Sequence, residues 1–134
     1  MIIRFATEKD KLSAIRSLQK NQTNYNTVAQ LKEDISLNRL IVAENNGKLL
    51  AKCALVEETS YNYMAIKRLC VFSNKSKGKG IASALIKYVI SLNLGILGAT
   101  PWADNEATKH ILEKNGFKFQ YTFLDNYCFY KRDF

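Results

Sequence analysis

The sequence predicts an α/β fold in which helices flank a central mixed sheet. Stretches with the composition of strands alternate along the chain with stretches of helical period. A glycine-rich turn also joins a strand-like run to a helix-like run, as expected in a strand–helix–strand crossover. The 134 residues suffice for one hydrophobic core and show no repeat or break in composition. We therefore expect a single domain over residues 1–134.

The first part of the chain predicts a strand and two helices. Residues 2–6 (IIRFA) have strand composition, and Thr7 and Asp10 have the spacing of a capping box. A second, shorter helix follows, with Thr27 as its candidate cap. The inward-facing residues expected from the helical period are Leu12, Ile15 and Leu18 in the first helix, and Val28, Leu31 and Ile35 in the second.

From residue 40 the pattern changes to that of strands. Residues 40–44 and 48–58 predict a hairpin around Asn46-Gly47, because these two residue types tolerate the positive φ of a tight turn. Residues 63–72 (YMAIKRLCVF) are rich in apolar, aromatic and β-branched side chains and predict a further strand.

The next segments predict a helix over 80–92 and a short strand over 96–100. The helix carries apolar residues at helical period, and Gly95 lies just past its expected end. The residues expected to face inward are Ile81, Leu85, Val89 and Leu92.

The last third predicts a helix and two strands. The helix begins after Asp104 or Asn105 and is closed by Gly116. Residues 117–123 (FKFQYTF) alternate strictly, as a half-buried strand should, and residues 126–134 supply the final strand.

Composition limits the classes of protein and of partner. No apolar run approaches the roughly 18 residues of a membrane span, and the N-terminus lacks the layout of a secretion signal. Cys53, Cys70 and Cys128 are widely spaced, which favours core packing over a zinc site or a disulfide framework. We therefore expect a cytoplasmic protein without a membrane partner. The formal net charge of +8 favours a polyanionic partner of some kind.

The glycine- and lysine-rich stretch KSKGKGIASALIKYVI, residues 75–90, predicts an anion site at the start of a helix. The first amides of a helix have no partner inside it, and glycines let an anion approach them closely. The stretch is not a P-loop, because no Lys-Ser or Lys-Thr pair follows its last glycine, and it lacks the third glycine of the dinucleotide fingerprint. A solvated turn with solubilising lysines is the alternative.

Residues 68–90 (RLCVFSNKSKGKGIASALIKYVI) resemble the acetyl-CoA-binding motif of the GNAT superfamily of N-acetyltransferases, [Q/R]-x-x-G-x-[G/A]. Lysine stands at Lys77, where arginine or glutamine is usual. Residues 105–117 (NEATKHILEKNGF) resemble a second segment of the family, and the predicted order of elements is also the family's. The resemblance therefore covers nearly the whole chain and implies a GNAT-like acyl-CoA N-acyltransferase fold.

The resemblance implies acetyl-CoA as co-substrate and a primary amine as acceptor. The backbone of Cys70, Val71 and Phe72 would run along the pantetheine arm, and Asn105 would contact that arm. In the family the fourth and fifth strands separate to admit the cofactor, and Pro101 fits the end of a strand that stops pairing. The amides implied to hold the pyrophosphate are those of Lys77, Gly78, Lys79, Gly80, Ile81 and Ala82.

The chain departs from the family pattern at the catalytic acid. The tyrosine that often protonates the departing thiolate is replaced by Leu112, and His110 points to another side of the helix. Thr108, Tyr127 and Tyr130 are the alternative candidates, which the sequence does not rank.

The general base is equally open, with Glu57 and Glu58 at the end of the third strand as candidates. The segment from Val71 to Lys77 is also one residue longer than usual, so Phe72 replaces the usual valine or the loop is extended. The backbone donor for the oxyanion is therefore not assigned.

Two other functions stay open. The charge, the lysine turn and the aromatic residues Phe117, Phe119, Tyr121 and Phe123 would suit a module that binds nucleic acid or another polyanion. Against this, alternating aromatic residues are more often core, and the basic residues are scattered. Leu112 is the reason for a further hypothesis, in which the protein is a relative of the family that binds CoA but has lost catalysis. The identity of the acceptor and a homodimer are left open.

Overall fold

The computed structural model describes residues 1–10, 28–71 and 80–133. In these ranges the strands form a mixed seven-stranded sheet, in which β4 and β5 are parallel and the other recorded pairs are antiparallel. The strand order is β1-β2-β3-β4-β5-β7-β6. The mixed sheet with flanking helices that the sequence predicts is thereby confirmed. The elements are β1 (Ile2–Phe5), α2 (Val28–Ser36), β2 (Leu40–Asn45), β3 (Lys48–Glu58), β4 (Tyr63–Val71), α3 (Ile81–Ser91), β5 (Leu97–Ala99), α4 (Glu106–Lys114), β6 (Lys118–Phe123) and β7 (Tyr127–Arg132).

The described chain groups into two compact units. Unit 1 comprises Met1–Ala54 and Arg68–Leu85, and unit 2 comprises Leu55–Lys67 and Ile86–Phe134. Strands β3 and β4 and helix α3 each contribute residues to both units. A single domain over residues 1–134 stays a prediction.

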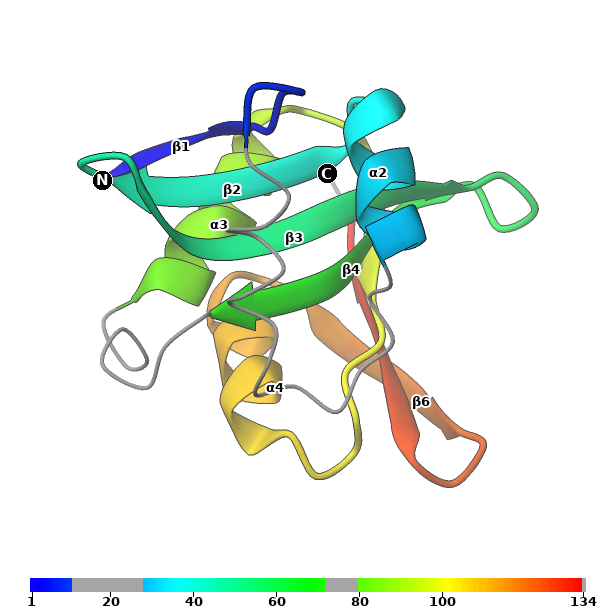
Figure 1. Ribbon diagram of the computed structural model, residues 1–134. Coiled ribbons are helices and arrows are strands. Elements are labelled where there is room, and N and C mark those ends of the chain that lie inside the picture. The colour runs from blue at the N-terminus through cyan, green and yellow to red at the C-terminus, as the bar shows by residue number, and fades with distance from the viewer. Residues whose placement is uncertain (11–27, 72–79, 134) are drawn as a thin grey trace. The chain divides into compact units, whose positions relative to one another are not determined.

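Unit 1 is built on the antiparallel strands β1, β2 and β3. The β2–β3 turn has φ of 52° at Asn46 and 80° at Gly47, which confirms the predicted hairpin. Helix α2 lies against β2 and β3 (Figure 1), and its residues Leu31 and Ile35 face the core as the helical period predicts. The buried residues of this core are Ala6, Leu31, Leu40, Val42, Leu49, Ala54 and Cys70.

Part of the predicted N-terminal capping box is present. The Asp10 carboxylate accepts a hydrogen bond from the Thr7 backbone N–H at 2.7 Å. The helix predicted to follow it, with Leu12, Ile15 and Leu18, and the candidate cap Thr27 lie outside the described residues.

Helix α3 follows the sequence-based prediction closely. Ile81, Leu85 and Val89 are buried, and Leu92 is half-buried just past the end of the helix. Asn93 adopts the left-handed conformation near the helix end, two residues before Gly95. Helix α3 and the other helices of the described chain are too short or too polar to cross a membrane.

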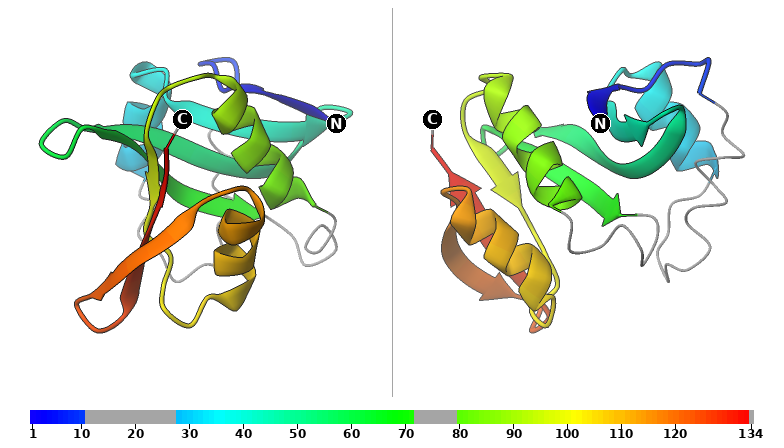
Figure 2. Two further views of the ribbon diagram at one scale, coloured as in Figure 1. Left: turned by 180° about the vertical axis from the view of Figure 1, so that it is seen from behind. Right: turned by 90° about the vertical axis from the view of Figure 1, so that its left-hand side faces the viewer.

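Unit 2 contains β5, α4 and the β6–β7 hairpin, with α4 beside β6 (Figure 2). Asn105 is the N-cap of α4, since its side-chain oxygen accepts from the Thr108 N–H at 3.2 Å. Gly116 closes the helix with φ of 88°. The hydrogen bond between Asn105 and Thr108 shows that Asn105, and not Asp104, is the cap among the two that the sequence predicts.

The prediction that residues 117–123 form a half-buried strand is wrong in its burial. Phe119 and Tyr121 are exposed by 52% and 55%, whereas the buried Phe117 lies just before the strand. The reason is that β6 is the last strand in the sheet order and pairs with β7 alone among the described strands. The alternating residues therefore lie at an edge of the sheet.

Candidate active site

The parallel pairing of β4 and β5 is short. Met64 pairs with Leu97 and Ile66 with Ala99, and β5 ends there. Pro101 follows two residues later, and its carbonyl oxygen accepts from the Cys128 N–H at 3.0 Å. The pairing of β5 with β4 therefore ends before Pro101, whereas contact with β7 continues through the Pro101 carbonyl and the Trp102–Tyr127 bridge.

A cavity of about 470 Å³ lies in unit 2 at the end of this pairing. Its lining includes Ala65, Gly98, Ala99 and Thr100 from β4, β5 and the residue after β5. Cavities of this size in proteins commonly hold small molecules. The aromatic residues lining the cavity are Tyr61, Tyr63, Phe123 and Tyr127.

Two charged side chains of opposite sign also line the cavity. Glu58, at the carboxyl end of β3, forms a salt bridge of 2.8 Å with Lys67 on β4. About 30% of the Glu58 side chain and 39% of the Lys67 side chain are exposed. Burial raises the pKa of the Tyr63 phenol, and the charge of Glu58 raises it further. The carboxylate therefore acts electrostatically on the aromatic wall of the cavity.

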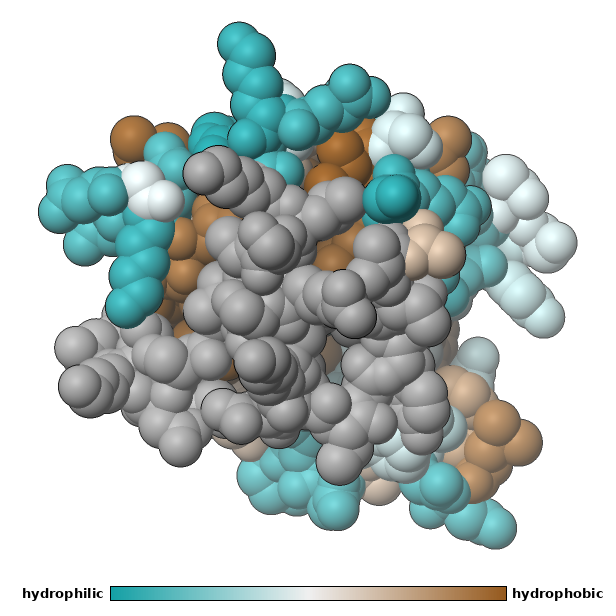
Figure 3. Space-filling view, in the orientation of Figure 1, coloured by the Kyte–Doolittle hydropathy of each residue, from teal (hydrophilic) through white to brown (hydrophobic). Residues whose placement is uncertain are grey.

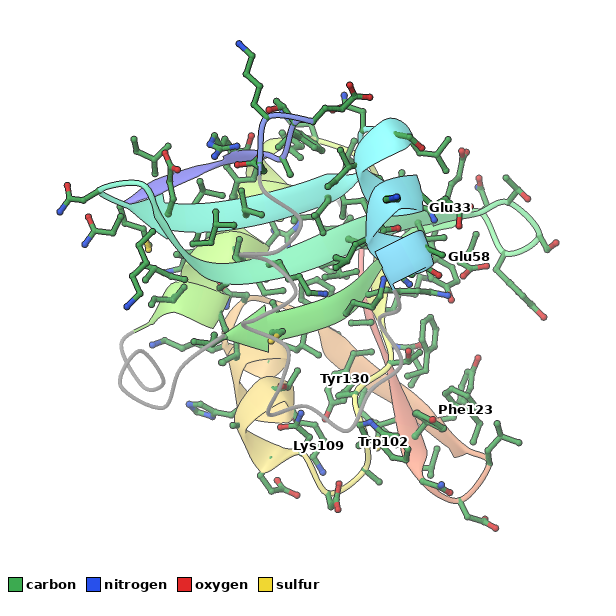
Figure 4. The ribbon with its side chains drawn as sticks, in the orientation of Figure 1. Glu33, Glu58, Trp102, Lys109, Phe123 and Tyr130 are labelled. Atoms are coloured by element: carbon green, nitrogen blue, oxygen red, sulfur yellow. The ribbon has the colours of Figure 1, made fainter. Side chains whose placement is uncertain are left out.

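The aromatic wall belongs to a continuous series of ring contacts within unit 2. The rings of Phe123 and Tyr127 are stacked, with centroids 5.4 Å apart, and Trp102 lies 4.6 Å from Tyr127. Figure 4 labels Phe123, Trp102 and Glu58. The remaining contacts of the series join Tyr61 to Tyr63, Tyr63 to Phe129, Phe129 to Tyr121, and Tyr121 to Phe123.

The position of Tyr63 depends on a glycine. A Cβ atom at Gly98 would lie 2.5 Å from Cε2 of Tyr63 and 3.0 Å from Cε1 of Phe129. A side chain at residue 98 would therefore displace the Tyr63 ring from the cavity wall.

The candidate bases and acids named from the sequence differ in whether they line the cavity. Glu58 and Tyr127 line the cavity, whereas Glu57 is exposed and is not among the lining residues. Thr108 is half-buried on α4 and is not among the lining residues either. The buried Tyr130 hydroxyl donates a hydrogen bond to Glu113 Oε1 at 2.9 Å. Burial is the main cause that raises the pKa of Tyr130 to about 12, and this hydrogen bond is the second. Tyr127 is thus better placed than Tyr130 to act on a molecule in the cavity.

The position where the family often has a tyrosine acid is occupied here by the buried Leu112. Leu112 is 1% exposed, and His110 is exposed on another side of α4, as the helical period predicts. Neither residue is among those lining the cavity.

The residues implied to bind the cofactor are only partly described. Phe72, Lys77, Gly78 and Lys79 lie outside the described residues. Gly80 precedes α3 with φ of 78°, and its carbonyl accepts from the Ala84 N–H at 2.9 Å, so it occupies the N-cap position. The other described members are Cys70 and Ile81, which are buried, and Val71, Ala82 and Asn105, which are half-buried.

The sequence-based prediction missed a buried charge cluster in unit 1. The Asp34 carboxylate, on α2, is fully buried and accepts from Arg39 Nε at 2.7 Å and from Arg68 Nη2 and Nε at 2.8 and 3.1 Å. Gln30 donates a further hydrogen bond of 3.2 Å. Arg68 has φ of 56° within β4, a strained conformation for a residue with a side chain, and the two-bond contact with Asp34 holds it there.

Lys52, on β3, is also fully buried in unit 1. It pairs with Val42 in the β2–β3 register, so its side chain lies on the face of the sheet that carries the core residues Val42 and Leu40. Its Nζ has no hydrogen-bond partner among the residues that the structure describes. Burial lowers the pKa of this ammonium group from 10.5 to about 8.

Comparison with known proteins places these features in a family. Residues 36–119 match the model of the acetyltransferase (GNAT) domain, which is more than half of the chain. The chain belongs to the GNAT acetyltransferases. This result confirms the family suggested by the motifs at residues 68–90 and 105–117. Comparison with curated proteins gives no significant match.

Solved structures of GNAT proteins have the same fold. A GNAT acetyltransferase from Bacillus cereus has a TM-score of 0.85 at 16% identity, covering 98% of this chain and 96% of that chain. The ribosomal-protein-S18-alanine N-acetyltransferase of Escherichia coli has a TM-score of 0.80 at 15% identity, covering 98% and 92%. A spermidine N-acetyltransferase from Vibrio cholerae has a TM-score of 0.76 at 18% identity, covering 99% and 95%. At these identities the likeness concerns the fold.

Proposed function

We propose that this GNAT protein transfers the acetyl group of acetyl-CoA to a primary amine that binds in the unit 2 cavity. Membership of an acetyltransferase family supports acetyl-CoA as the donor. The cavity supports an amine acceptor, because it combines a carboxylate with aromatic walls at the end of the β4–β5 pairing. The observation that carries the proposal is that Glu58 and Tyr127, both candidates from the sequence, line this one cavity.

In the proposed reaction, Glu58 accepts a proton from the bound ammonium group, directly or through a water molecule. The amine lone pair then attacks the thioester carbon and a C–N bond forms. As the tetrahedral intermediate collapses, its nitrogen releases its second proton to water, the C–S bond breaks and CoA leaves as its thiolate. A backbone N–H of the fourth strand stabilises the oxyanion of the tetrahedral intermediate. Because a free thiol has a pKa of about 8.5, the thiolate is a tolerable leaving group near neutral pH even without a strong acid. Tyr127 is the proposed donor of a proton to the sulfur of the departing thiolate.

The proposed donor-binding residues are those of the GNAT motif. In unit 1 these are the backbone of Cys70 and Val71 for the pantetheine arm, and the amides of Gly80, Ile81 and Ala82 for the pyrophosphate. In unit 2 Asn105 is proposed to contact the arm through the side-chain amide nitrogen that the helix cap leaves unused.

A relative that binds CoA without catalysis is the second candidate. The buried Leu112 favours it, because this position often carries the family's tyrosine acid. The two functions differ in one measurement, the release of free thiol from acetyl-CoA in the presence of an amine.

Two measurements test the proposal. Calorimetry with CoA should show binding in the micromolar range, and an amine panel should give steady release of thiol. Absence of both results would refute the transferase, and CoA binding without thiol release would establish the second candidate.

A matched pair of variants tests the donor site. Gly80 and Gly47 have φ of 78° and 80°, and an added Cβ at either meets no atom of the described residues within 4 Å, so substitution by glutamate strains the backbone at both positions similarly. Gly80→Glu adds negative charge at the start of α3 and should abolish CoA binding, whereas Gly47→Glu in the β2–β3 turn should leave it unchanged. Equal affinities in the two variants would remove Gly80 from the donor site.

A further inference from the structure

We infer that the unit 2 cavity selects a small monoamine whose single ammonium group is attached to a flat, apolar body, and that it discriminates against polyamines. The inference rests on the proposed function and names the class of acceptor. Three properties of the cavity support it: its rings, its charge and its rim.

The rings supply flat apolar surface around a cation. Tyr61, Tyr63, Phe123 and Tyr127 line the cavity, and the stacked pair of Phe123 and Tyr127 presents two nearly parallel rings. Aromatic faces attract an ammonium group, and they offer offset stacking to another flat ring. A ligand that has both an ammonium group and a flat body uses both kinds of contact.

The charge of the cavity limits the ligand to one ammonium group. Glu58 is the one carboxylate among the lining residues, and Lys67 already balances it at 2.8 Å. A first ammonium group can share the Glu58 carboxylate. A second would lose hydration without gaining a counter-ion, and it would be repelled by Lys67 and by a chain of net charge +8.

The rim adds an exposed apolar side chain. Leu124, in the β6–β7 turn, lines the cavity with 75% of its surface exposed and φ of 50°. Hydrophobic side chains over this turn reach the surface at the lower right of Figure 3. A leucine is an unfavourable residue for such a turn, where asparagine or glycine would be less strained, so its presence favours contact with an apolar ligand.

The inference is tested by equilibrium binding of three amines to the full chain. Trp102 is the single tryptophan, and it contacts the cavity residue Tyr127, so its fluorescence reports on the cavity. The probes are 2-phenylethylamine, pentylamine and 1,5-diaminopentane. The first two differ in the flat ring, and the last two differ in one added ammonium group.

We expect the dissociation constant to rise in that order, by about fivefold at each step. Phe123→Leu removes a stacking partner for a flat ring, so it should weaken the binding of 2-phenylethylamine by about fivefold and that of pentylamine, which has no ring, by much less. Phe119→Leu, on the same strand but outside the cavity, is the matched control and should change neither.

The inference is overturned if 1,5-diaminopentane binds as tightly as pentylamine, if Phe123→Leu binds 2-phenylethylamine like wild type, or if none of the probes binds by fluorescence and by calorimetry. Thiol release from acetyl-CoA separates this failure from that of the proposed function. The predicted order of binding without thiol release leaves the ligand class standing and refutes the transferase. Thiol release that is fastest with the diamine refutes the ligand class and leaves the transferase standing.

Discussion

Unit 1 and unit 2 each contain a carboxylate paired with a cation, but in opposite surroundings. Asp34 in unit 1 is fully buried and accepts hydrogen bonds from Arg39, Arg68 and Gln30. Glu58 in unit 2 is 30% exposed, ion-paired with Lys67 and part of a cavity wall. A carboxylate whose oxygens are surrounded by arginines serves the structure, whereas one that faces a cavity can exchange its partner for a ligand.

The same contrast applies to the apolar residues. The core of unit 1 encloses even Lys52, and the large apolar side chains that unit 1 exposes, Met1, Ile2 and Leu37, lie at the N-terminus and just after α2. Unit 2 leaves Phe119, Tyr121 and Leu124 exposed near the β6–β7 turn. We therefore expect substitutions of charged residues in unit 1 to alter mainly stability, and those at the cavity in unit 2 to alter mainly ligand binding.

The largest expected effect is that of Asp34→Ala. Removal of the carboxylate leaves Arg39 and Arg68 without their buried partner, which should lower the free energy of unfolding by about 3–5 kcal/mol. Urea denaturation measures the loss. The neighbouring Glu33→Ala is the control, because Glu33 is mostly exposed and 3.8 Å from Arg39, so its effect should stay within about 0.5 kcal/mol. Equal effects would contradict a structural role specific to Asp34.

Lys52→Met should stabilise the protein by about 1–3 kcal/mol at pH 7, because it removes a buried ammonium group without a hydrogen-bond partner in the described chain. The effect should also depend on pH. The pKa of Lys52 is about 8 in the folded chain and 10.5 ordinarily, so between these values the unfolded chain holds a proton that the folded chain has released. The free energy of unfolding of wild type should therefore increase relative to that of the variant as the pH rises from about 8 to 10.5.

This pH effect must be read as a difference between the two proteins. Burial raises the pKa of the Cys53 thiol from 9.0 to about 12, which lowers the stability of both proteins as pH rises through that range. Denaturation curves for wild type and Lys52→Met at pH 7 and pH 10 isolate the lysine. A constant difference would contradict the lowered pKa of Lys52.

Gly98→Ala should destabilise unit 2 by about 1–3 kcal/mol, since the added methyl group overlaps the rings of Tyr63 and Phe129. The substitution should also weaken the binding of 2-phenylethylamine, because Tyr63 lines the cavity. Thermal denaturation and the Trp102 titration measure the two effects. Loss of stability with normal amine affinity would show that the Tyr63 ring does not contribute to binding.

The smallest expected effect is that of Leu124→Asn. Asparagine tolerates the positive φ of the turn, so the variant should be more stable than wild type by about 0.5–1 kcal/mol. The same substitution removes apolar surface from the rim of the cavity and should weaken the binding of 2-phenylethylamine. A variant that is both more stable and binds normally would indicate that the leucine has no part in the cavity.

Features that depend on neighbouring residues in the chain could be predicted from the sequence. The turn at Asn46-Gly47 and the Asn105 cap follow from residue types at fixed spacing, and both are present in the structure. Glu58 and Tyr127 were among several unranked candidates, named because they lie at the end of the third predicted strand and on the last one.

The remaining features depend on contacts between distant parts of the chain. Asp34 and Arg68 are separated by 34 residues, and no local pattern relates them. Lys52 is a residue type that is mostly exposed, so its burial shows only once β2 and β3 are paired. The cavity collects aromatic residues from the β3–β4 connection, β4 and both ends of the β6–β7 turn, and its contents could not be read from any one segment.

The central claim, that Glu58 in the unit 2 cavity serves the amine acceptor, is tested most directly by comparing Glu58→Gln with Glu57→Gln. The measurement is kcat/KM for 2-phenylethylamine, from thiol release at saturating acetyl-CoA. We predict that Glu58→Gln lowers it by about 100-fold or more, whereas Glu57→Gln, exposed and outside the cavity wall, stays within about twofold of wild type. Equal values in the two variants would contradict the claim.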